Sequence, residues 1–320
     1  MLQEVEISNY KTSKGKHLSS LMLTYETFGK ELHTAPVVLV NHALTGNSNV
    51  CGEDGWWNGL IGKGKCINTD KYTVLSFNIP GNGYDINNSN LFSDYKIFNA
   101  RDIAGIFGKA VEQLNIKSLY AAIGGSVGGG IAWELAALEP GLIEHLIPVA
   151  TDWKSTDWLK ANCLIQEQIL LNSNNPVHDA RLHAMLIYRS PESFKQKFDR
   201  SYNAEKGMYN MESWLFHHGK KLNDRFTLSA YKGLNHILAN IDITKGERSF
   251  KDVASTIESN IHIISVNSDG FFTAAEDEIT YKELLKVKQN VTHKIIDSVH
   301  GHDAFLIEFD QLAELLKDVF

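Results

Sequence analysis

A serine stands between glycines in the segment Gly124-Gly125-Ser126-Val127-Gly128, which fits the pattern G-x-S-x-G. The apolar run 119–123 precedes it and a run with helical spacing, 131–138, follows it, so the chain should turn sharply from a strand into a helix. Small residues at 124 and 128 let another backbone approach without a Cβ clash, and the sharp turn holds the serine in a strained backbone conformation. Ser126 is therefore a predicted nucleophile, although a packing turn or a phosphate-binding loop also fits the motif alone.

Two later residues supply the partners that a serine nucleophile needs. Asp269 follows the apolar run 261–266, and His302 follows the last apolar run of the chain. In this chain order His302 would take the serine proton, while Asp269 would fix the histidine tautomer and stabilise the imidazolium. Three groups in the expected order and context favour a catalytic triad of Ser126, Asp269 and His302 over a packing turn.

Other residues of the right type lie nearby in the sequence. Asp277 and Asp297 are alternative acids, and His300 is an alternative base. Asp277 falls inside a run with helical spacing, and Asp297 lies very near the histidine segment. Both are therefore less suitable than Asp269.

The helix that follows Ser126 also bears on the chemistry. Its amino end would face the reacting carbonyl, where unpaired amides and the helix dipole favour a developing negative charge. The backbone N–H of Val127 is therefore predicted to donate to the oxyanion of an acyl-transfer reaction.

The wider sequence predicts the elements that hold these residues. Short β-branched or apolar runs are typical of buried strands, and they occur at 37–40, 73–77, 119–123, 146–149, 261–266 and 294–296. Most are separated by segments with helical spacing, such as 101–114, which indicates a mainly parallel sheet flanked by helices. Residues 4–8 and 20–28 predict an antiparallel start to that sheet. With the serine motif, this order predicts the α/β-hydrolase fold.

One interval interrupts the alternation of strands and helices. Between about residues 151 and 246, amphipathic helical patterns such as 163–171 and 180–187 occur without a convincing strand. We therefore expect a hydrolase core made of residues 1–151 and 247–320, with a helical lid inserted at residues 152–246.

Composition narrows the class of protein. The 320 residues are 43% hydrophobic and 22% charged, as in an ordinary globular protein. The net charge of −7 is spread along the chain, so nucleic acid is not an expected partner. The start of the chain lacks the pattern of a signal peptide, and no run approaches the roughly 18 apolar residues of a membrane span. We expect a cytoplasmic protein that does not contact membranes.

Thiols and histidines give no sign of a metal centre. Cys51, Cys66 and Cys163 are odd in number and lack Cys-x-x-Cys spacing, which favours reduced structural thiols. His217 and His218 are adjacent, so on a helix they would point in different directions rather than at one metal ion. No metal is expected.

A glycine- and lysine-rich segment partly matches a nucleotide-binding loop. Gly59-Leu60-Ile61-Gly62-Lys63-Gly64-Lys65 has the glycine and lysine spacing of that motif, but Cys66 stands where a serine or threonine should bind Mg²⁺. No strand precedes it. We expect a surface loop near the mouth of the active site.

Beyond the fold, the chain resembles the homoserine O-acetyltransferases of methionine biosynthesis, which are α/β-hydrolases that transfer acyl groups from coenzyme A. The resemblance runs over most of the chain and is carried by Asn41-His42-Ala43-Leu44-Thr45-Gly46, the stretch from Gly55-Trp56-Trp57 to Lys65, Ile123-Gly124-Gly125-Ser126-Val127-Gly128-Gly129, residues 226–231 and Gly301-His302-Asp303-Ala304-Phe305-Leu306.

The resemblance implies roles for further residues. The N–H of Leu44 would be the second oxyanion donor, in the loop after the first parallel strand, as the fold also expects. Arg181 and Tyr188 would hold the carboxylate of homoserine, and Asp303 would receive its ammonium group. It also implies acetyl-CoA as the acyl donor, no bound cofactor, small-molecule partners and a homodimer.

Three departures from the family pattern and several alternatives accompany this interpretation. Val127 replaces the methionine usual after the nucleophile, the stretch after the second parallel strand is reduced to Pro80-Gly81-Asn82-Gly83-Tyr84-Asp85, and the segment before Arg181 is short. Succinyl-CoA as the donor and serine as the acceptor stay open. So does an esterase or thioesterase that uses water, whereas a binding-only protein is disfavoured because no triad member is missing.

Overall fold

A computed structural model describes residues 1–85 and 90–320, which form an eight-stranded sheet of order β1-β2-β6-β3-β7-β8-β11-β12. Its strands are β1 (Gln3–Lys11), β2 (His17–Gly29), β3 (Val37–Asn41), β6 (Thr73–Phe77), β7 (Leu119–Gly125), β8 (Ile143–Val149), β11 (Asn260–Val266) and β12 (Val291–Ile296). The first two strands pair antiparallel to each other, and β2 pairs antiparallel to β6. From β6 to β12 all neighbours are parallel, as the α/β-hydrolase fold requires.

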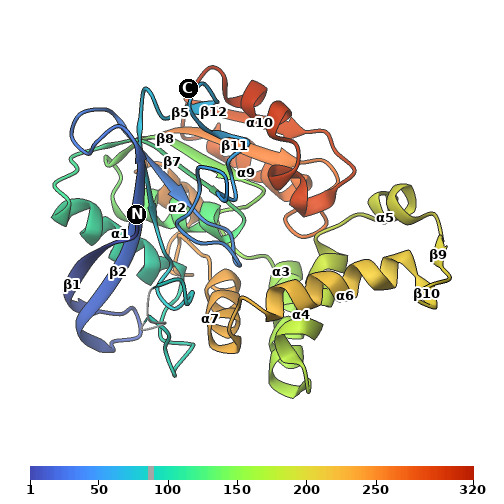
Figure 1. Ribbon diagram of the computed structural model, residues 1–320. Helices are drawn as coiled ribbons and strands as arrows, with labels where there is room; N and C mark the ends of the chain where they lie inside the picture. The colour runs from blue at the N-terminus through green and yellow to red at the C-terminus, as the bar shows by residue number, and fades with distance from the viewer. Residues whose placement is uncertain (86–89) are drawn as a thin grey trace.

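Side chains alternate between two hydrophobic layers on opposite faces of the sheet. In β3, Val37 and Leu39 pack into one layer, while Val38 and Val40 pack into the other. The flanking helices are α1 (Ala100–Gln113), α2 (Val127–Leu138), α8 (Phe250–Ala254), α9 (Ala274–Leu284) and α10 (Phe309–Leu316) (Figure 1). The predicted runs in β3, β6, β7, β8 and β11 are buried because both of their faces are covered, whereas β12 at the edge of the sheet leaves Ile295 exposed.

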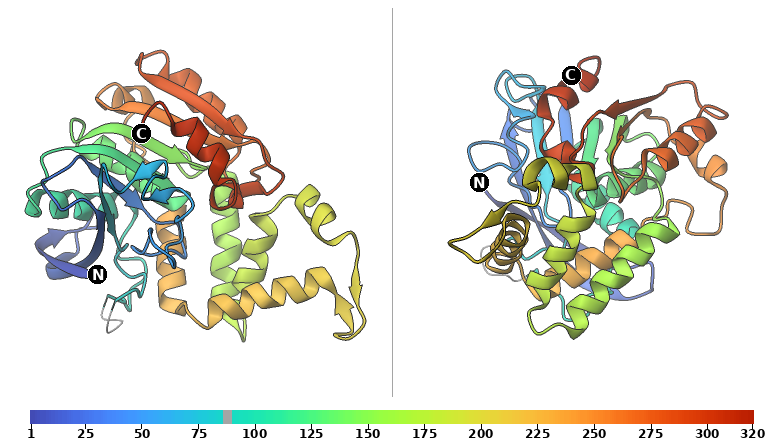
Figure 2. Two further views of the ribbon diagram at one scale, coloured as in Figure 1. Left: turned by 45° about the horizontal axis from the view of Figure 1, so that its top comes forward. Right: turned by 90° about the vertical axis from the view of Figure 1, so that its right-hand side faces the viewer.

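The segment between β8 and α8 is mostly helical. It comprises α3 (Asp157–Asn172), α4 (Pro176–Ile187), α5 (Pro191–Phe198), β9 (Tyr202–Asn203), β10 (Met208–Tyr209), α6 (Asn210–Asn223) and α7 (Leu228–Ala239). The β9–β10 pair is a strand feature that the helical patterns did not predict. The stretch from α5 to α6 projects from the body of the molecule in Figure 1 and in the left view of Figure 2. We call residues 152–246 the lid, and the division into core and lid stays a prediction.

The glycine- and lysine-rich segment is only partly the surface loop that was expected. Leu60 and Ile61 are buried, and two short strands, β4 (Ile61–Gly62) and β5 (Ile67–Asn68), pair within it. The preceding Trp57 is also fully buried, and its indole N–H donates to the carbonyl of Phe305 over 3.0 Å. The start of the segment therefore packs beneath the C-terminal elements, and only residues 63–65 are exposed.

None of the helices in residues 1–85 and 90–320 is long and apolar enough to cross a membrane.

The turn between β7 and α2 depends on very close backbone contacts. A Cβ at Gly128 would lie 2.7 Å from the carbonyl oxygen of His42 and closer still to that of Asn41. A Cβ at Gly124 would lie 2.7 Å from the amide nitrogen of Gly129. Because the obstructing atoms are backbone, no side-chain rotation relieves such contacts.

Gly128→Ala is therefore expected to lower the free energy of unfolding by about 3 kcal/mol, through overpacking at the crossing. The control is Gly108→Ala in α1, where the nearest atom to a new Cβ is Leu135 Cδ1 at 3.5 Å. That change should leave stability equal or raise it by up to about 1 kcal/mol. Urea unfolding followed by circular dichroism measures both, and equal stabilities of the two variants would contradict the packing argument.

Candidate active site

Ser126 occupies the turn between β7 and α2 and is nearly buried. Its φ of 57° and ψ of −128° lie in a region that non-glycine residues rarely adopt. The Ser126 N–H donates to the carbonyl of Val149 over 3.0 Å, which ties the strained residue to the neighbouring strand β8. The strand-turn-helix geometry predicted from the motif is present.

Asp269 and His302 form a buried hydrogen-bonded pair. Asp269 Oδ2 lies 2.7 Å from His302 Nδ1. The other carboxylate oxygen accepts the backbone N–H groups of Phe271, at 2.7 Å, and Phe272, at 3.0 Å. Both oxygens are therefore engaged, and an ionised acid oriented in this way fixes the proton of His302 on Nδ1 and leaves Nε2 free to accept.

Strand order brings the three predicted triad residues to one edge of the sheet. Ser126, Asp269 and His302 follow β7, β11 and β12, and parallel strands end at a common edge. Phe305 packs between His302 and the turn that carries Ser126: its ring lies 5.6 Å from that of His302 and directly obstructs any Cβ at Gly125. No hydrogen bond joins Ser126 to His302 within the described part of the chain, and such bonds often form only with substrate.

Aromatic rings enclose His302 on several sides. Ring centroids lie 5.3 Å away for Tyr188, 5.1 Å for Phe271, 5.7 Å for Phe272 and 5.6 Å for Phe305. Only 3% of His302 is exposed. The rings hold the imidazole plane and keep water from the Asp269 pair. Sequence reasoning missed Phe271 and Phe272, although they follow directly after Asp269 and Gly270.

The alternative acids and base have other partners. Asp277 lies in α9 and accepts the Ser265 hydroxyl at 2.6 Å. Burial, with Asp152 nearby, raises the pKa of Asp277 well above its usual range, so this carboxyl is a poor partner for an imidazolium. Asp297 accepts from the amide of Asn267. His300 Nδ1 lies 3.3 Å from Nη1 of Arg189 and from the hydroxyl of Ser193 instead of near Asp269.

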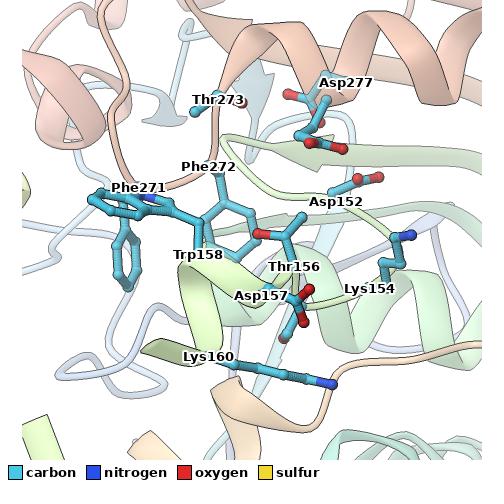
Figure 3. A pocket seen from close by; sticks show the side chains of 12 residues that line it. Asp152, Lys154, Thr156, Asp157, Trp158, Lys160, Phe271, Phe272, Thr273 and Asp277 are labelled. Carbon is cyan, nitrogen blue, oxygen red and sulfur yellow. The ribbon is translucent and has the colours of Figure 1, made fainter. Parts of the chain in front are cut away.

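A cavity of about 500 Å³ lies behind the Asp269 loop. In Figure 3, Phe271, Phe272 and Trp158 lie toward one end of it, with Asp152 and Lys154 at the other. Burial raises the pKa of Asp152 to about 7. The Trp158 N–H donates to the carbonyl of Gly270 at 2.6 Å, so this wall also supports the loop that carries Asp269.

The two predicted oxyanion donors lie on either side of the close backbone crossing at Gly128. Val127 is the first residue of α2, and Leu44 follows β3 in the loop that packs against Gly128. Neither Leu44 N nor Val127 N donates a hydrogen bond to any acceptor in residues 1–85 and 90–320. Two amides held in fixed backbone without a partner are what an oxyanion site requires.

The structure brings Arg181 and Tyr188 close to the histidine. Arg181 lies in the middle of α4 and Tyr188 directly after its end, and the Arg181 guanidinium lies 5.9 Å from the Tyr188 ring centroid. The Tyr188 ring in turn packs on His302. Within the described residues, no carboxylate lies within 4.0 Å of Arg181.

Asp303 is already paired, through a residue that sequence reasoning missed. Its Oδ2 accepts from Nε of Arg189 at 3.0 Å, and both side chains are largely buried. The Asp303 N–H also donates to the carbonyl of Tyr188 at 3.2 Å. Asp303 and Tyr188 thus lie together beside His302, and Arg189 neutralises the carboxylate predicted to receive an ammonium group. The sequence around Arg189 gave no signal of this pairing, because Asp303 is far along the chain.

Positive charge gathers where the lid faces the core. Arg225, between α6 and α7, donates to the carbonyl of Thr45, the residue after Leu44, at 3.0 Å. Burial and the nearby Arg181 lower the pKa of Arg225, and they lower that of His218 to about 4. Such a cationic region favours an anionic substrate group. In residues 1–85 and 90–320, no cluster of three or more His, Cys, Asp or Glu side chains is arranged to hold a metal ion.

Comparisons with known proteins agree with this fold. A curated homoserine O-acetyltransferase from Salinibacter ruber is 29% identical, covering 99% of this chain and 97% of that protein. The crystal structure of a homoserine O-acetyltransferase from Bacillus anthracis superposes with a TM-score of 0.89 at 19% identity, covering 100% and 97% of the two chains. Esterase E22 superposes with a TM-score of 0.88 at 18% identity, covering both chains fully. The family described as "alpha/beta hydrolase fold" matches residues 36–227, and the chain belongs to that family.

Proposed function

We propose that the protein is an O-acyltransferase that moves an acetyl group from acetyl-CoA to the hydroxyl of L-homoserine, a step of methionine biosynthesis. The observation that carries the proposal is the buried bond between His302 Nδ1 and Asp269 Oδ2, at the sheet edge that also holds Ser126. The full-length likeness to curated homoserine O-acetyltransferases supports acetyl-CoA and L-homoserine as the pair of substrates.

The proposed mechanism has two half-reactions at Ser126. His302 takes the proton of the Ser126 hydroxyl as its oxygen attacks the thioester carbonyl, and the N–H groups of Leu44 and Val127 stabilise the oxyanion. Collapse expels the CoA thiolate, which receives the proton from His302. In the second half, His302 takes the proton of the homoserine hydroxyl, whose oxygen attacks the acyl-enzyme. Collapse releases O-acetylhomoserine, and the Ser126 oxygen receives the proton from His302, which restores the free enzyme.

A small cavity lies beside Leu44, the predicted oxyanion donor. Leu44, Tyr188 and Phe271 line it, together with polar side chains of the lid, and its volume is about 10 Å³. That is room for about one water molecule. The polar groups bond to one another: Tyr231 donates to Gln166 at 3.2 Å, and Gln166 Nε2 lies 2.7 Å from His183 Nδ1.

Arg181 and Asp303 are the proposed clamp for the two charged ends of the acceptor. Arg181 has no carboxylate partner of its own in the described residues, so its guanidinium is available to a substrate carboxylate. Asp303 keeps one oxygen for an ammonium group while Arg189 holds the other. An amino acid bound at both ends would place its hydroxyl near His302 and displace water.

The second candidate function is an esterase that uses water as acceptor. The likeness to esterase E22 favours it, because that structure shares the whole fold.

The proposal further includes a homodimer, which light scattering tests, and a cytoplasmic location, where CoA thioesters are available to biosynthetic enzymes. Exposed apolar residues of the lid helices, including Leu164, Leu186 and Phe216, support the dimer.

Ser126→Ala should abolish acyl transfer, and mass spectrometry of the wild-type protein with acetyl-CoA should find the acetyl group on Ser126.

His302→Ala should lower kcat by about 10⁴ or more, whereas His300→Ala should have a small effect because His300 bonds to Arg189 and Ser193. An inactive His300→Ala protein beside an active His302→Ala protein would show that the base is His300.

Arg189 and Asp303 should be coupled in stability. Their side chains are 15% and 14% exposed, so a double-mutant cycle of Arg189→Met and Asp303→Asn should give a coupling of about 2 kcal/mol in chemical unfolding. The control pair is Lys220 and Asp224, with side chains 75% and 55% exposed, where about 0.5 kcal/mol or less is expected. Equal coupling in both cycles would mean that Arg189 does not neutralise Asp303.

Arg181→Ala should separate transferase from esterase. If Arg181 holds the acceptor carboxylate, CoA release in the first half-reaction should be nearly unchanged, while deacylation by homoserine should slow by about a hundredfold. Arg248→Ala, at an exposed arginine outside the site, is the control. Stopped-flow measurement of both half-reactions distinguishes the transferase from the esterase. If homoserine does not accelerate wild-type deacylation over water, the esterase function replaces the transferase.

A further inference from the structure

His42 is a buried side chain in the loop after β3 that the mechanism has not yet used. It is 0% exposed, and its Nδ1 lies 2.8 Å from the carbonyl oxygen of Ala43. On the other side of the ring, Nε2 lies 3.0 Å from the backbone nitrogen of Ile79 and 3.3 Å from the side-chain amide nitrogen of Asn82. Both ring nitrogens are therefore engaged within the protein.

The contacts determine which nitrogen carries the proton. The backbone N–H of Ile79 is only a donor, so Nε2 of His42 must accept, and the proton must be on Nδ1. Asn82 is oriented to match, because its Oδ1 accepts from the backbone of Tyr84 at 3.0 Å and from Asn90 at 3.1 Å. The ring is thus a neutral imidazole that donates from Nδ1 to the Ala43 carbonyl. Burial, which lowers the pKa of His42 to about 4, agrees with this state.

The Ala43 carbonyl belongs to the same peptide group as the N–H of Leu44. Described peptide bonds are all trans, so the C=O and N–H of this group point in opposite directions. The carbonyl is held by His42 and also by the N–H of Gly46 at 2.9 Å. Fixing the carbonyl therefore fixes the direction of the N–H that is the predicted oxyanion donor.

We infer that His42 is a positioning residue for acylation: its Nδ1–H holds the peptide between Ala43 and Leu44 so that the Leu44 N–H is aimed at the oxyanion before substrate arrives. The inference rests on the proposed acyl-enzyme at Ser126. A donor that needs no reorientation during the reaction is the kind that lowers the barrier most, and loss of one such donor typically slows the chemical step by about 10²–10³.

Two substitutions at position 42 each keep one of the two hydrogen bonds that the ring makes with the backbone. An asparagine amide at position 42 can reproduce the Nδ1–H donor to Ala43 but leaves the Ile79 N–H without its acceptor. A glutamine amide reaches the position of Nε2 and can accept from Ile79 but loses the donor to Ala43. If His42 acts through the Leu44 peptide, His42→Asn should be the more active variant and His42→Gln the more stable one.

The measurement is the pre-steady-state burst of p-nitrophenolate from p-nitrophenyl acetate, with Tm recorded for each protein. The expected burst rate is about a hundredfold lower for His42→Gln and within about tenfold of wild type for His42→Asn.

Ser76→Ala is the control: it removes a buried hydrogen bond of 2.8 Å to the carbonyl of Val40, in the strand before the same loop. Its Tm should therefore fall without a change in burst rate. If His42→Gln does not fold, His42→Ala, which lacks both contacts, takes its place in the comparison with His42→Asn.

Burst rates that are equal in the two His42 variants, or that rank as their Tm values do, would overturn the inference. The activated ester acylates Ser126 without coenzyme A or homoserine, so this outcome is separate from failure of the proposed function. A normal burst with the ester, together with no transfer from acetyl-CoA to homoserine, would instead reject the transferase and leave the role of His42 intact.

Discussion

The left-handed conformation of Ser126 depends on one backbone crossing. Gly128, at the start of α2, lies so close to the carbonyls of Asn41 and His42 that no side chain fits between them, and the Asn41 amide donates to the Gly128 carbonyl at 3.1 Å. The end of β3, the end of β7 and the start of α2 therefore move as one unit. Because the nucleophile and both predicted oxyanion amides belong to that unit, their mutual geometry is set by packing of the core and not by the substrate.

The residues proposed to hold the substrate come largely from another part of the chain. Arg181 lies within α4, Tyr188 and Arg189 lie just after it, and Arg225 lies between α6 and α7. This side is tied to the histidine segment by the Arg189–Asp303 ion pair and by the Asp303 N–H bond to Tyr188. A movement of the lid would therefore displace Asp303, the residue next to His302. Closure over the acceptor would then be coupled to the position of the base.

Much of the fold, and the strand-turn-helix setting of Ser126, could be predicted because their signals are local. Each buried strand is a short apolar run, and Ser126 lies in a motif whose flanking strand and helix are adjacent in sequence. Arg189 and His42 could not be predicted, because their roles depend on partners distant in the chain, Asp303 and Ile79. The segment 59–65 was misjudged for the same reason: its composition resembles a surface loop, but the C-terminal elements cover its apolar start.

The core alone does not distinguish a transferase from an esterase, since esterase E22 has the same fold over its full length. The distinction must lie in features that an esterase would gain nothing by keeping. Arg181 is such a feature: it is half-buried, it lacks a carboxylate partner in the described residues, and it repels the neighbouring Arg225. An anionic group of a bound substrate would relieve the repulsion between Arg181 and Arg225, which is the physical reason for proposing that Arg181 holds the acceptor carboxylate.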